Sequence, residues 1–317
     1  MRRDAASYGC NACGAQYPIR YGIPDFRLKP DPYISIDAEV AKIEGFAVAG
    51  RSFRELVRAY YVLTPECPPE LHSHYIAAMA AGINRGAGLL RRLRLSFPRL
   101  GTARLLDLGC GTAGMSIAGS RQYGEVIGVD VALRWLVMGQ QRLREEGVNV
   151  SLVCANAESL PFHSGTFDAV VADAVVEHVN NPGAMRDETL RVINQTGAFL
   201  FTTNNRFSLL REPHLRLWGF GLVPRRWMEP LAWRIRKTPY KVRLLSRRAL
   251  VRLFSGRADV LLPQYDEGEL GPRNEGLRRA WTRLNQAGLF RVLIRNFAPQ
   301  YFVMGSRRDT PRAVDGD

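Results

Sequence analysis

Five short apolar runs lie along the middle of the chain, and each has the length and composition of a buried strand. They cover residues 103–108, a second run at 125–130, a third that ends at Cys154, a fourth at 167–172 and a fifth at 198–203. Between the first two, residues 112–124 place small and apolar side chains at helical spacing. Strands that alternate with helices predict an α/β domain with a doubly wound, mostly parallel sheet.

The chain ahead of this region has a helical pattern. Apolar residues recur at a spacing near 3.6 over 52–63 and 75–95, with a break at Pro65, Pro68 and Pro69. Residues 33–100 therefore predict a helical segment. Two interpretations stay open for it, a plain packing layer and a cap that helps to bind the substrate.

Composition adds bounds on size and location. A chain of 317 residues can hold one domain with additions or two small domains, and 46% hydrophobic with 23% charged residues is ordinary for a soluble protein. The first residues are followed by no apolar signal region, and no apolar run approaches the roughly 18 residues of a membrane span. The five cysteines have irregular spacing, which does not form a disulfide framework. A cytoplasmic protein is expected.

A glycine loop follows the first strand. Gly109, Gly111 and Gly114 read as G-x-G-x-x-G and lead into a helix whose free N–H groups can receive a ligand. Asp130 ends the second strand about 20 residues later, where nucleoside-binding folds place the acid that holds ribose hydroxyls. The loop, taken alone, fits NAD and S-adenosylmethionine equally well.

Asp107 distinguishes the two cofactors. It lies two residues before Gly109, at the carboxyl end of the first strand. A carboxylate there would repel a pyrophosphate and attract the ammonium group of a methionine moiety. The loop therefore favours S-adenosylmethionine.

Residues 103–205 resemble the class I S-adenosylmethionine-dependent methyltransferases, in particular the branch of the quinone-biosynthesis methylases. The resemblance rests on the glycine loop with Asp107, on Asp130 as the ribose-binding acid, and on the adenine-side corner formed by residues 156–158 and 160–162. It implies a Rossmann-like fold with a seven-stranded sheet. The cofactor-binding residues that it implies are Asp107, Gly109, Cys110, Gly111, Gly114, Asp130, Val131, Asn156, Ala157 and Asp173.

The resemblance also orders the rest of the chain. After the fifth strand such a core continues with a helix, for which 246–254 is the candidate, and an antiparallel strand pair, for which 258–264 and 296–305 are the candidates. The expected organisation is a partial zinc-ribbon-like knuckle at 1–32, a helical cap at 33–100, the methyltransferase domain at 101–308 with an insertion at 207–245, and a disordered tail at 309–317.

Positive charge is concentrated in and after the insertion. The formal net charge is +14, yet residues 101–205 carry seven Lys and Arg against eleven Asp and Glu, whereas 207–253 carry twelve against two. A basic block of this kind can face nucleic acid, an anionic lipid headgroup or a phosphorylated substrate. The other interpretation is an arginine-rich solvated surface.

The insertion also holds aromatic residues. Residues 216–237 contain three of the five tryptophans, and Pro224 is placed to start a helix. In a helix over 225–237, Trp227, Met228, Leu231 and Ile235 fall on one face and the cations fall elsewhere. This pattern suits a membrane interface or a lipid-linked substrate, and it also suits a helix that packs on its own core.

The first residues raise the question of a metal site. Residues 10–26 resemble the second half of a zinc ribbon that is found fused ahead of bacterial methyltransferase domains. A structural zinc site needs four ligands, and Cys10 and Cys13 supply two. Cys67, His72 and His74 lack ribbon spacing. We expect no bound metal.

His178 is the candidate general base. Methyl transfer from a sulfonium is an in-line displacement that needs alignment and, for a weakly acidic hydroxyl, a base. The related quinone O-methylases carry Glu-His just past the fourth strand within S-E-x-x-E-H, where two Glu and the His can bind a divalent ion. Here Ala174 replaces the first Glu, which speaks against a metal. His178 could also be a helix-start histidine without a proton-transfer role, and His214 is a weaker candidate.

Three classes of function stay open. The first is a methyltransferase that acts on a small-molecule acceptor, lipid-linked or glycan-related, with peripheral membrane contact through 216–237. The second is an RNA methyltransferase that uses the basic block at 207–253, although no RNA-binding module is recognisable. The third is a noncatalytic cofactor-binding partner, against which the intact glycine loop and Asp130 argue.

Overall fold

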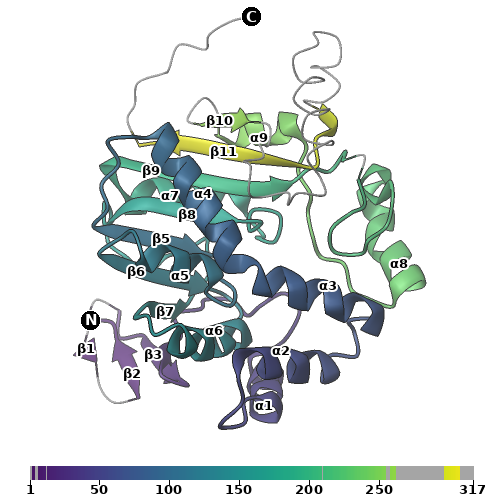
Figure 1. The fold of residues 1–317 in the computed structure, drawn as a ribbon, viewed down its shortest axis with the longest axis horizontal. Coiled ribbons are helices and arrows are strands. Elements are labelled where there is room, and N and C mark those ends of the chain that lie inside the picture. Colours follow the sequence, from purple (N-terminus) through teal and green to yellow (C-terminus); the bar gives the residue numbers. More distant parts are fainter. Residues whose placement is uncertain are drawn as a thin grey trace, which may run out of the picture.

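The structure is a computed structural model that describes residues 2–3, 6–11, 13–208, 210–254, 258–261 and 296–307. In this part of the chain a seven-stranded sheet forms the centre, in the order β10-β11-β9-β8-β5-β6-β7 (Figure 1). The strands are β5 (Arg104–Leu108), β6 (Glu125–Asp130), β7 (Ser151–Cys154), β8 (Phe167–Asp173), β9 (Ile193–Asn204), β10 (Asp259–Leu261) and β11 (Gln300–Ser306).

Parallel pairing holds the sheet from β7 to β9, and β11 is antiparallel to β9 and β10. The five apolar runs all form strands, so the predicted doubly wound, mostly parallel sheet is confirmed. The later candidates also take the expected form, since 246–254 contains α9 (Arg247–Phe254) and the strand pair contains β10 and β11. Residues 262–264 and the predicted tail at 309–317 lie outside the described residues.

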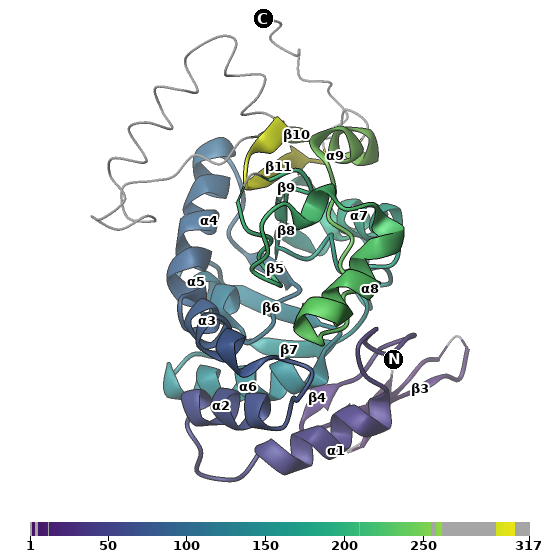
Figure 2. The same cartoon turned by 90° about the vertical axis from the view of Figure 1, so that its right-hand side faces the viewer.

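Helices cover both faces of the sheet (Figure 2). On one face lie α4 (Gly82–Ser96), α5 (Gly114–Ser120) and α6 (Leu133–Glu145); on the other lie α7 (Pro182–Val192) and α9. The helix α7 begins as its sequence directs, with Pro182 in the first turn and the Asn181 side chain accepting the N–H of Ala184. Leu106, Val170 and Phe199 are completely buried under α7 and α9, and Leu105 and Leu200 are completely buried on the other face.

The first hundred residues form a small sheet and a run of helices. The described strands are β1 (Arg2–Arg3), β2 (Ser7–Gly9), β3 (Gln16–Arg20) and β4 (Ile23–Pro24); α1 (Ile36–Phe46), α2 (Phe53–Val62) and α3 (Pro69–Ala80) follow. Ser52 and Glu55 form a capping box that starts α2. Asp25 pairs with Cys154, so the chain after β4 extends the edge of the central sheet beside β7.

The insertion after β9 has its own small core. It contains a short 3-10 helix (Phe220–Leu222) and α8 (Arg225–Arg236), which starts directly after Pro224 as expected. The predicted stripe on this helix is divided between two environments: Met228 is buried and Leu231 partly so, whereas Trp227 and Ile235 are exposed. Ala232 is buried in their place, because the helix packs against the core of the same insertion, which contains Leu215, Phe220, Tyr240, Val242 and Leu244.

Candidate functional site

A cavity of about 500 Å³ opens at the carboxyl ends of β5, β6 and β8. Its walls come from four parts of the chain that are far apart in sequence. They are the glycine loop with the strand ends, the segment before α1, the helices α2 and α3, and the insertion. In open α/β sheets this edge is where ligands bind.

The glycine loop forms the floor of one end of the cavity. Gly109 has φ +74° and its N–H donates to the Val129 carbonyl at 2.7 Å. A Cβ on Gly109 would lie 2.3 Å from Cγ2 of Val175, so a side chain is excluded there. Gly111 lines the cavity and has open space on its side-chain face. The loop therefore offers a bare backbone surface that a ligand can approach closely.

Asp130 lies beside this loop and lines the cavity. Its two carboxylate oxygens accept the N–H groups of Gly111 and Ala132, each at 2.8 Å. Burial raises the pKa of Asp130 to about 6, against the lowering effect of these two bonds. Each oxygen keeps a further lone pair, so the carboxylate can still accept two hydroxyl groups of a ribose. This arrangement fits the predicted role.

Three predicted cofactor residues lie behind the cavity wall instead of on it. Asp107 is buried and accepts the Ser116 hydroxyl at 2.6 Å. Cys110 is also buried, with its thiol directed at the Gly111 carbonyl. A Cβ on Gly114 would come within 2.8 Å of the Gly82 backbone, so this glycine lets α5 approach α4. Gly109 and Gly111 line the cavity, whereas these three residues are not among the lining residues, so their direct contact with a ligand stays a prediction.

The predicted adenine-side corner is covered by a segment that the sequence did not connect with it. Asn156 and Ala157 both line the cavity. The Asn156 side chain, however, accepts the N–H groups of Leu28 and Lys29 at 2.8 and 3.1 Å and donates to the Lys29 carbonyl. Residues 27–33, which we call the strap, thus use the amide that was expected to hold adenine, and they form that wall of the cavity.

Buried ion pairs fix the strap. Arg27 bonds Glu39 of α1 at 2.6 Å and also reaches the Val131 carbonyl. Arg134 of α6 bonds the same Glu39 at 2.7 Å and Asp31 at 3.0 Å. All four side chains are nearly inaccessible to solvent, so removing Arg134 would leave the buried Asp31 carboxylate without this ion pair. Val131, a predicted cofactor residue, lines the cavity at this junction.

Asp173, a predicted cofactor residue, ends β8 and lines the cavity. Its carboxylate accepts two hydrogen bonds from the Arg85 guanidinium of α4, at 2.5 and 2.6 Å, and a third from the Thr202 hydroxyl. The next residue, Ala174, has φ +57°, which is uncommon for a residue with a side chain. The chain turns sharply here, and the turn directs residues 174–179 along the cavity.

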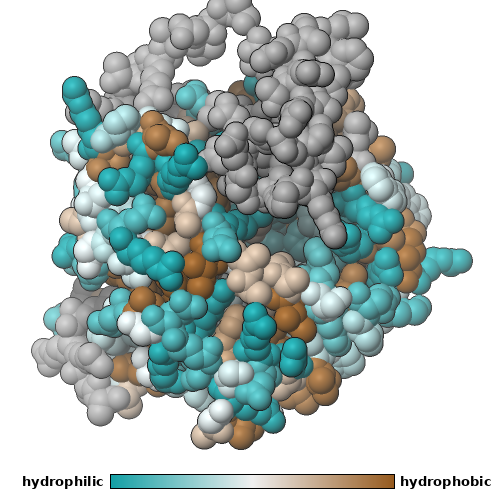
Figure 3. Space-filling model, viewed as in Figure 1, coloured by the Kyte–Doolittle hydropathy of each residue, from teal (hydrophilic) through white to brown (hydrophobic). Residues whose placement is uncertain are grey.

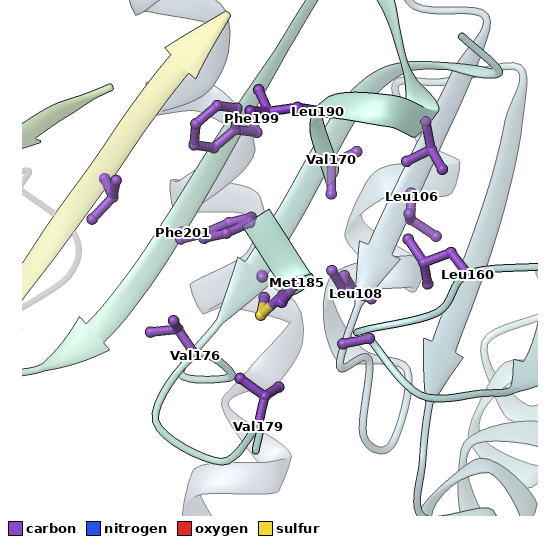
Figure 4. Packing of buried hydrophobic residues seen from close by; sticks show 14 of the residues in the cluster. Leu106, Leu108, Leu160, Val170, Val176, Val179, Met185, Leu190, Phe199 and Phe201 are labelled. Atoms are coloured by element: carbon purple, nitrogen blue, oxygen red, sulfur yellow. The ribbon is translucent and has the colours of Figure 1, made fainter. Parts of the chain in front are cut away.

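His178 lies in this turn, four residues ahead of α7, and not at a helix start as one interpretation held. Val176 and Val179 belong to the same buried cluster as Leu108 and Met185 (Figure 4), which anchors the turn on both sides of His178. Glu177 is completely buried and accepts the Thr203 hydroxyl at 2.9 Å. His178 therefore sits at a fixed place on the cavity wall.

His214 of the insertion lies next to His178 on the cavity wall. Its Nε2 lies 3.3 Å from Nε2 of His178, and its Nδ1 donates to Glu212 at 2.6 Å. Glu212, only 4% exposed, also accepts the N–H of Leu215 and the hydroxyl of Tyr240. Burial and the His214 charge lower the pKa of His178 to about 3. Burial opposes charge on His214 as well, but Glu212 outweighs it and raises the pKa of His214.

The insertion closes over this end by bonding to the N-terminal region. Tyr75 of α3 donates its hydroxyl to the His214 carbonyl at 2.7 Å, and Thr238 donates to the Glu66 carbonyl at 2.7 Å. Lys241 reaches the Pro32 carbonyl of the strap at 2.7 Å. Residues 33–100 and the insertion together therefore enclose the cavity end that holds the histidine pair.

Sequence reasoning missed several of these residues. Glu212, Tyr75 and Arg85 were not singled out, and nothing in the local sequence marks Tyr75 or Arg85. Glu212 stands two residues before His214, a spacing that could have suggested an oriented histidine. Tyr75 and Arg85 lie on predicted helices, and only the packing of those helices brings them to His214 and Asp173.

Within the described residues, no group of three or more His, Cys, Asp or Glu side chains has the geometry to hold a metal ion. Cys13 is exposed and Cys10 partly so. At the position of the metal-binding motif, Ala174 offers no ligand, and Glu177 bonds Thr203 and Asn204. In the same part of the chain, no helix is both long and apolar enough to cross a bilayer.

The methyltransferase domain family matches residues 106–201, which include the glycine loop, Asp130 and the turn with His178. The chain carries a class I methyltransferase domain. Curated relatives agree: an Azorhizobium caulinodans ubiquinone biosynthesis O-methyltransferase is 35% identical over 103 residues, covering 32% of this chain and 41% of the relative. A Yersinia pestis ubiquinone/menaquinone biosynthesis C-methyltransferase is 36% identical over 102 residues, covering 31% and 41%.

A Legionella pneumophila malonyl-[acyl-carrier protein] O-methyltransferase is 32% identical over 114 residues, 35% of this chain and 39% of the relative. The chain thus spans about two fifths of the length of these relatives. Among solved structures, geranyl diphosphate C-methyltransferase from Streptomyces coelicolor aligns with 83% of this chain and 87% of its own at 18% identity and a TM-score of 0.47. The family match at residues 106–201 ends before the insertion.

Because the sequence predicts S-adenosylmethionine at the glycine loop, this end is called the cofactor end of the cavity below. The end formed by the histidine pair, α3 and the insertion is called the acceptor end below.

Proposed function

We propose that this protein transfers a methyl group from S-adenosylmethionine to a hydroxyl of a small-molecule acceptor that is lipid-linked or glycan-related. The observation that carries the proposal is the cavity that joins the glycine loop and Asp130 at one end to His178 and His214 at the other. A methyl donor held at the first end and an acceptor at the second would meet beside the histidine pair.

The residues at the cofactor end fit this cofactor. Asp130 would bind the ribose hydroxyls, and the Gly109–Gly111 backbone would face the methionine part. Asn156 would contribute cavity wall and not an adenine contact, since its amide is bonded to the strap. When bound, the cofactor supplies a sulfonium methyl group that the acceptor oxygen displaces in line. The protein aligns the acceptor and takes up its proton.

The chemistry of the acceptor end supports a neutral reacting group. Tyr75 and Tyr240 line this end and Tyr33 and Tyr61 line the same cavity, and they offer aromatic surface and hydroxyl groups. Arg134 also reaches the cavity, but it is bonded to Asp31 and Glu39 and is therefore already neutralised. A hydroxyl on an apolar or aromatic frame matches this wall better than a phosphate would.

The outer surface of the insertion supports a membrane-associated acceptor. Trp218, Trp227 and Trp233 are 63%, 56% and 54% exposed. Arg211 lies over the Trp218 ring and Arg226 over the Trp227 ring. Figure 3 shows hydrophobic residues among hydrophilic ones at the right-hand edge, where α8 lies. Exposed tryptophans with arginines suit an anionic bilayer interface, to which each cation contributes roughly 1 kcal/mol.

Two measurements test the proposal. Isothermal calorimetry should show binding of S-adenosylmethionine and no binding of NAD; the reverse result would remove the proposed cofactor. Untargeted comparison of metabolites and lipids from a deletion strain should then reveal a species lighter by one methyl group.

Vesicle co-sedimentation tests the membrane part. Binding should rise with the content of anionic lipid and fall with salt, and Arg226→Gln with Arg234→Gln should weaken it. Arg225 and Arg236 are left unchanged because they bond the Leu244 carbonyl and Glu70. A matched control replaces the exposed Arg94 and Arg99, which lie near the far end of α4, away from α8 (Figures 1 and 2). Binding to RNA at moderate salt without vesicle binding would favour the RNA methyltransferase instead.

A further inference from the structure

The histidine pair raises a problem for the proposed reaction. A histidine whose pKa is far below neutral takes up a proton only weakly, and His178 is such a group because it is buried beside His214. An acceptor hydroxyl that gave its proton to His178 alone would lose it to a poor base. The structure offers a solution in the neighbour of His178.

We propose that His178 and His214 act as one proton-accepting pair, in which Glu212 holds the His214 ring and the proton of the acceptor hydroxyl ends on His214. This inference rests on the proposed function and adds to it the residues that receive the proton. It depends on two contacts, 2.6 Å between Nδ1 of His214 and Glu212 and 3.3 Å between the two Nε2 atoms.

Hydrogen-bond chemistry fixes where the protons start. An ionised carboxylate only accepts, so Nδ1 of His214 carries a proton that it donates to Glu212. Nε2 of the neutral His214 ring is then an acceptor, and Nε2–H of His178 donates to it. Nδ1 of His178 is left as the acceptor on the cavity wall.

The proton transfer balances with the methyl transfer. The O–H bond of the acceptor breaks and its proton binds Nδ1 of His178, while the proton on Nε2 of His178 moves to Nε2 of His214. The electron pair of the oxygen forms the new O–CH₃ bond, and the pair of the broken S–CH₃ bond stays on sulfur. The positive charge that leaves sulfur reappears on the His214 ring, next to the Glu212 carboxylate.

The surroundings hold the pair in this arrangement. Glu212 is fixed by the N–H of Leu215 at 2.6 Å and by the Tyr240 hydroxyl at 3.3 Å, and the His214 carbonyl accepts the Tyr75 hydroxyl. The titratable groups that face His214 are Glu212 and Tyr240 of the insertion, His178 and Glu177 of the turn, and His74 and Tyr75 of α3. The carboxylates Glu212 and Glu177 favour a charged His214 ring, whereas burial opposes it.

Nuclear magnetic resonance of the full-length protein with ¹⁵N-labelled histidine and S-adenosylhomocysteine tests the proposal without a known acceptor. The chain has five histidines, and single His→Gln variants assign their ring signals. We expect the Nε2–H tautomer for His178 and the Nδ1–H tautomer for His214 at high pH, with His214 charging first as the pH falls. A His178 ring that charges before His214 would overturn the proposal.

Two variants sharpen the test. Glu212→Gln keeps an oxygen for the Leu215 N–H but removes the charge, so His214 should charge at a pH lower by one unit or more. The control is Glu229→Gln on the exposed side of α8, which should leave both rings unchanged. If Glu212→Gln does not fold, His214→Gln serves instead and should let His178 charge at a higher pH. Unchanged His178 and His214 titrations in the variants would also overturn the proposal.

Calorimetry with S-adenosylmethionine on the same proteins separates this proposal from the broader one. Failure of the wild type to bind would refute the proposed function, whereas normal binding with unaltered histidine titrations would refute the proton pair alone. With an acceptor in hand, Glu212→Gln should lower kcat about 100-fold, shift the acidic limb of its pH profile downward and leave the KM for the cofactor unchanged.

Discussion

The two ends of the cavity differ in the groups that form their walls: mainly backbone at one end and side chains at the other. At the cofactor end, backbone N–H groups, glycines and one carboxylate form the wall of the cavity. They belong to the ends of strands that are packed between two layers of helices. At the acceptor end, the side chains of His178, His214, Tyr75 and Tyr240 form the wall, and three separate segments carry them. Substitutions at the first end would alter the sheet and its glycine loop. Substitutions at the second end would alter the acceptor site without disturbing the sheet.

The difference extends to how each end keeps its shape. Gly109 has a positive φ, and the Val175 side chain fills the space that a side chain on Gly109 would need. His214 is held by side-chain and carbonyl bonds to Glu212 and Tyr75, each of which one substitution can remove. Changes at the first end should therefore abolish cofactor binding, whereas changes at the second should spare it. The following experiments test this separation, beginning with the largest effect.

Gly109→Ala should weaken S-adenosylmethionine binding by about 100-fold or more, and Gly109→Arg should abolish it, because φ +74° and contact with Val175 both oppose a side chain. Calorimetry measures this. Val175→Ala in the Gly109→Ala background should recover part of the affinity, since it removes the clashing methyl groups. Gly147→Ala, at a left-handed glycine with open space, is the matched control. Full affinity in Gly109→Arg would show that the loop does not bind the cofactor.

Asp107→Asn should stabilise the protein above pH 7, by about 2 kcal/mol or more. Burial raises the pKa of Asp107 to about 7, so the folded protein keeps a proton that the unfolded chain releases near pH 4. The unfolded state binds fewer protons between these values, and the carboxyl therefore lowers the free energy of unfolding as pH rises.

Urea unfolding at pH 4 and pH 8 measures this effect. The exposed Asp187→Asn is the control and should change neither value. The same Asp107→Asn protein should bind S-adenosylmethionine more weakly if the carboxylate attracts the methionine ammonium from behind the loop. A variant that is no more stable at pH 8 would contradict the buried, proton-holding carboxyl.

Tyr75→Phe should affect the acceptor end alone. It removes the 2.7 Å bond to the His214 carbonyl and should cost about 1 kcal/mol of acceptor binding, with unchanged cofactor affinity. The KM for the acceptor and calorimetry with S-adenosylmethionine provide the two readings. An equal loss at both ends would mean that they are not separate.

Cys10→Ser with Cys13→Ser should change neither end. Two thiolates bind Zn²⁺ poorly without two further ligands, so elemental analysis of the wild type should find no stoichiometric zinc. Cofactor affinity should equal that of the wild type. One tightly held zinc per chain would contradict this expectation.

The sequence by itself determined the sheet and the cofactor end. Apolar runs mark buried parallel strands because both faces of such strands are covered, and the glycine loop can be recognised locally because Gly109, Gly111 and Asp130 belong to one strand–turn–helix–strand unit. His178 could be proposed from its place after the fourth strand. Each of these features depends on neighbours that are close in sequence or on a pattern that the sheet imposes.

Only the tertiary structure decided what surrounds those features. The strap lies on Asn156, Arg85 grips Asp173, and Glu212 and His214 meet His178, although tens of residues or more separate the partners along the chain. No periodicity records such pairings, because a side chain that bonds across segments looks locally like any other polar residue. The same reason explains α8: which of its apolar residues turn inward depends on Tyr240 and Leu244, against which the helix packs after the chain folds back.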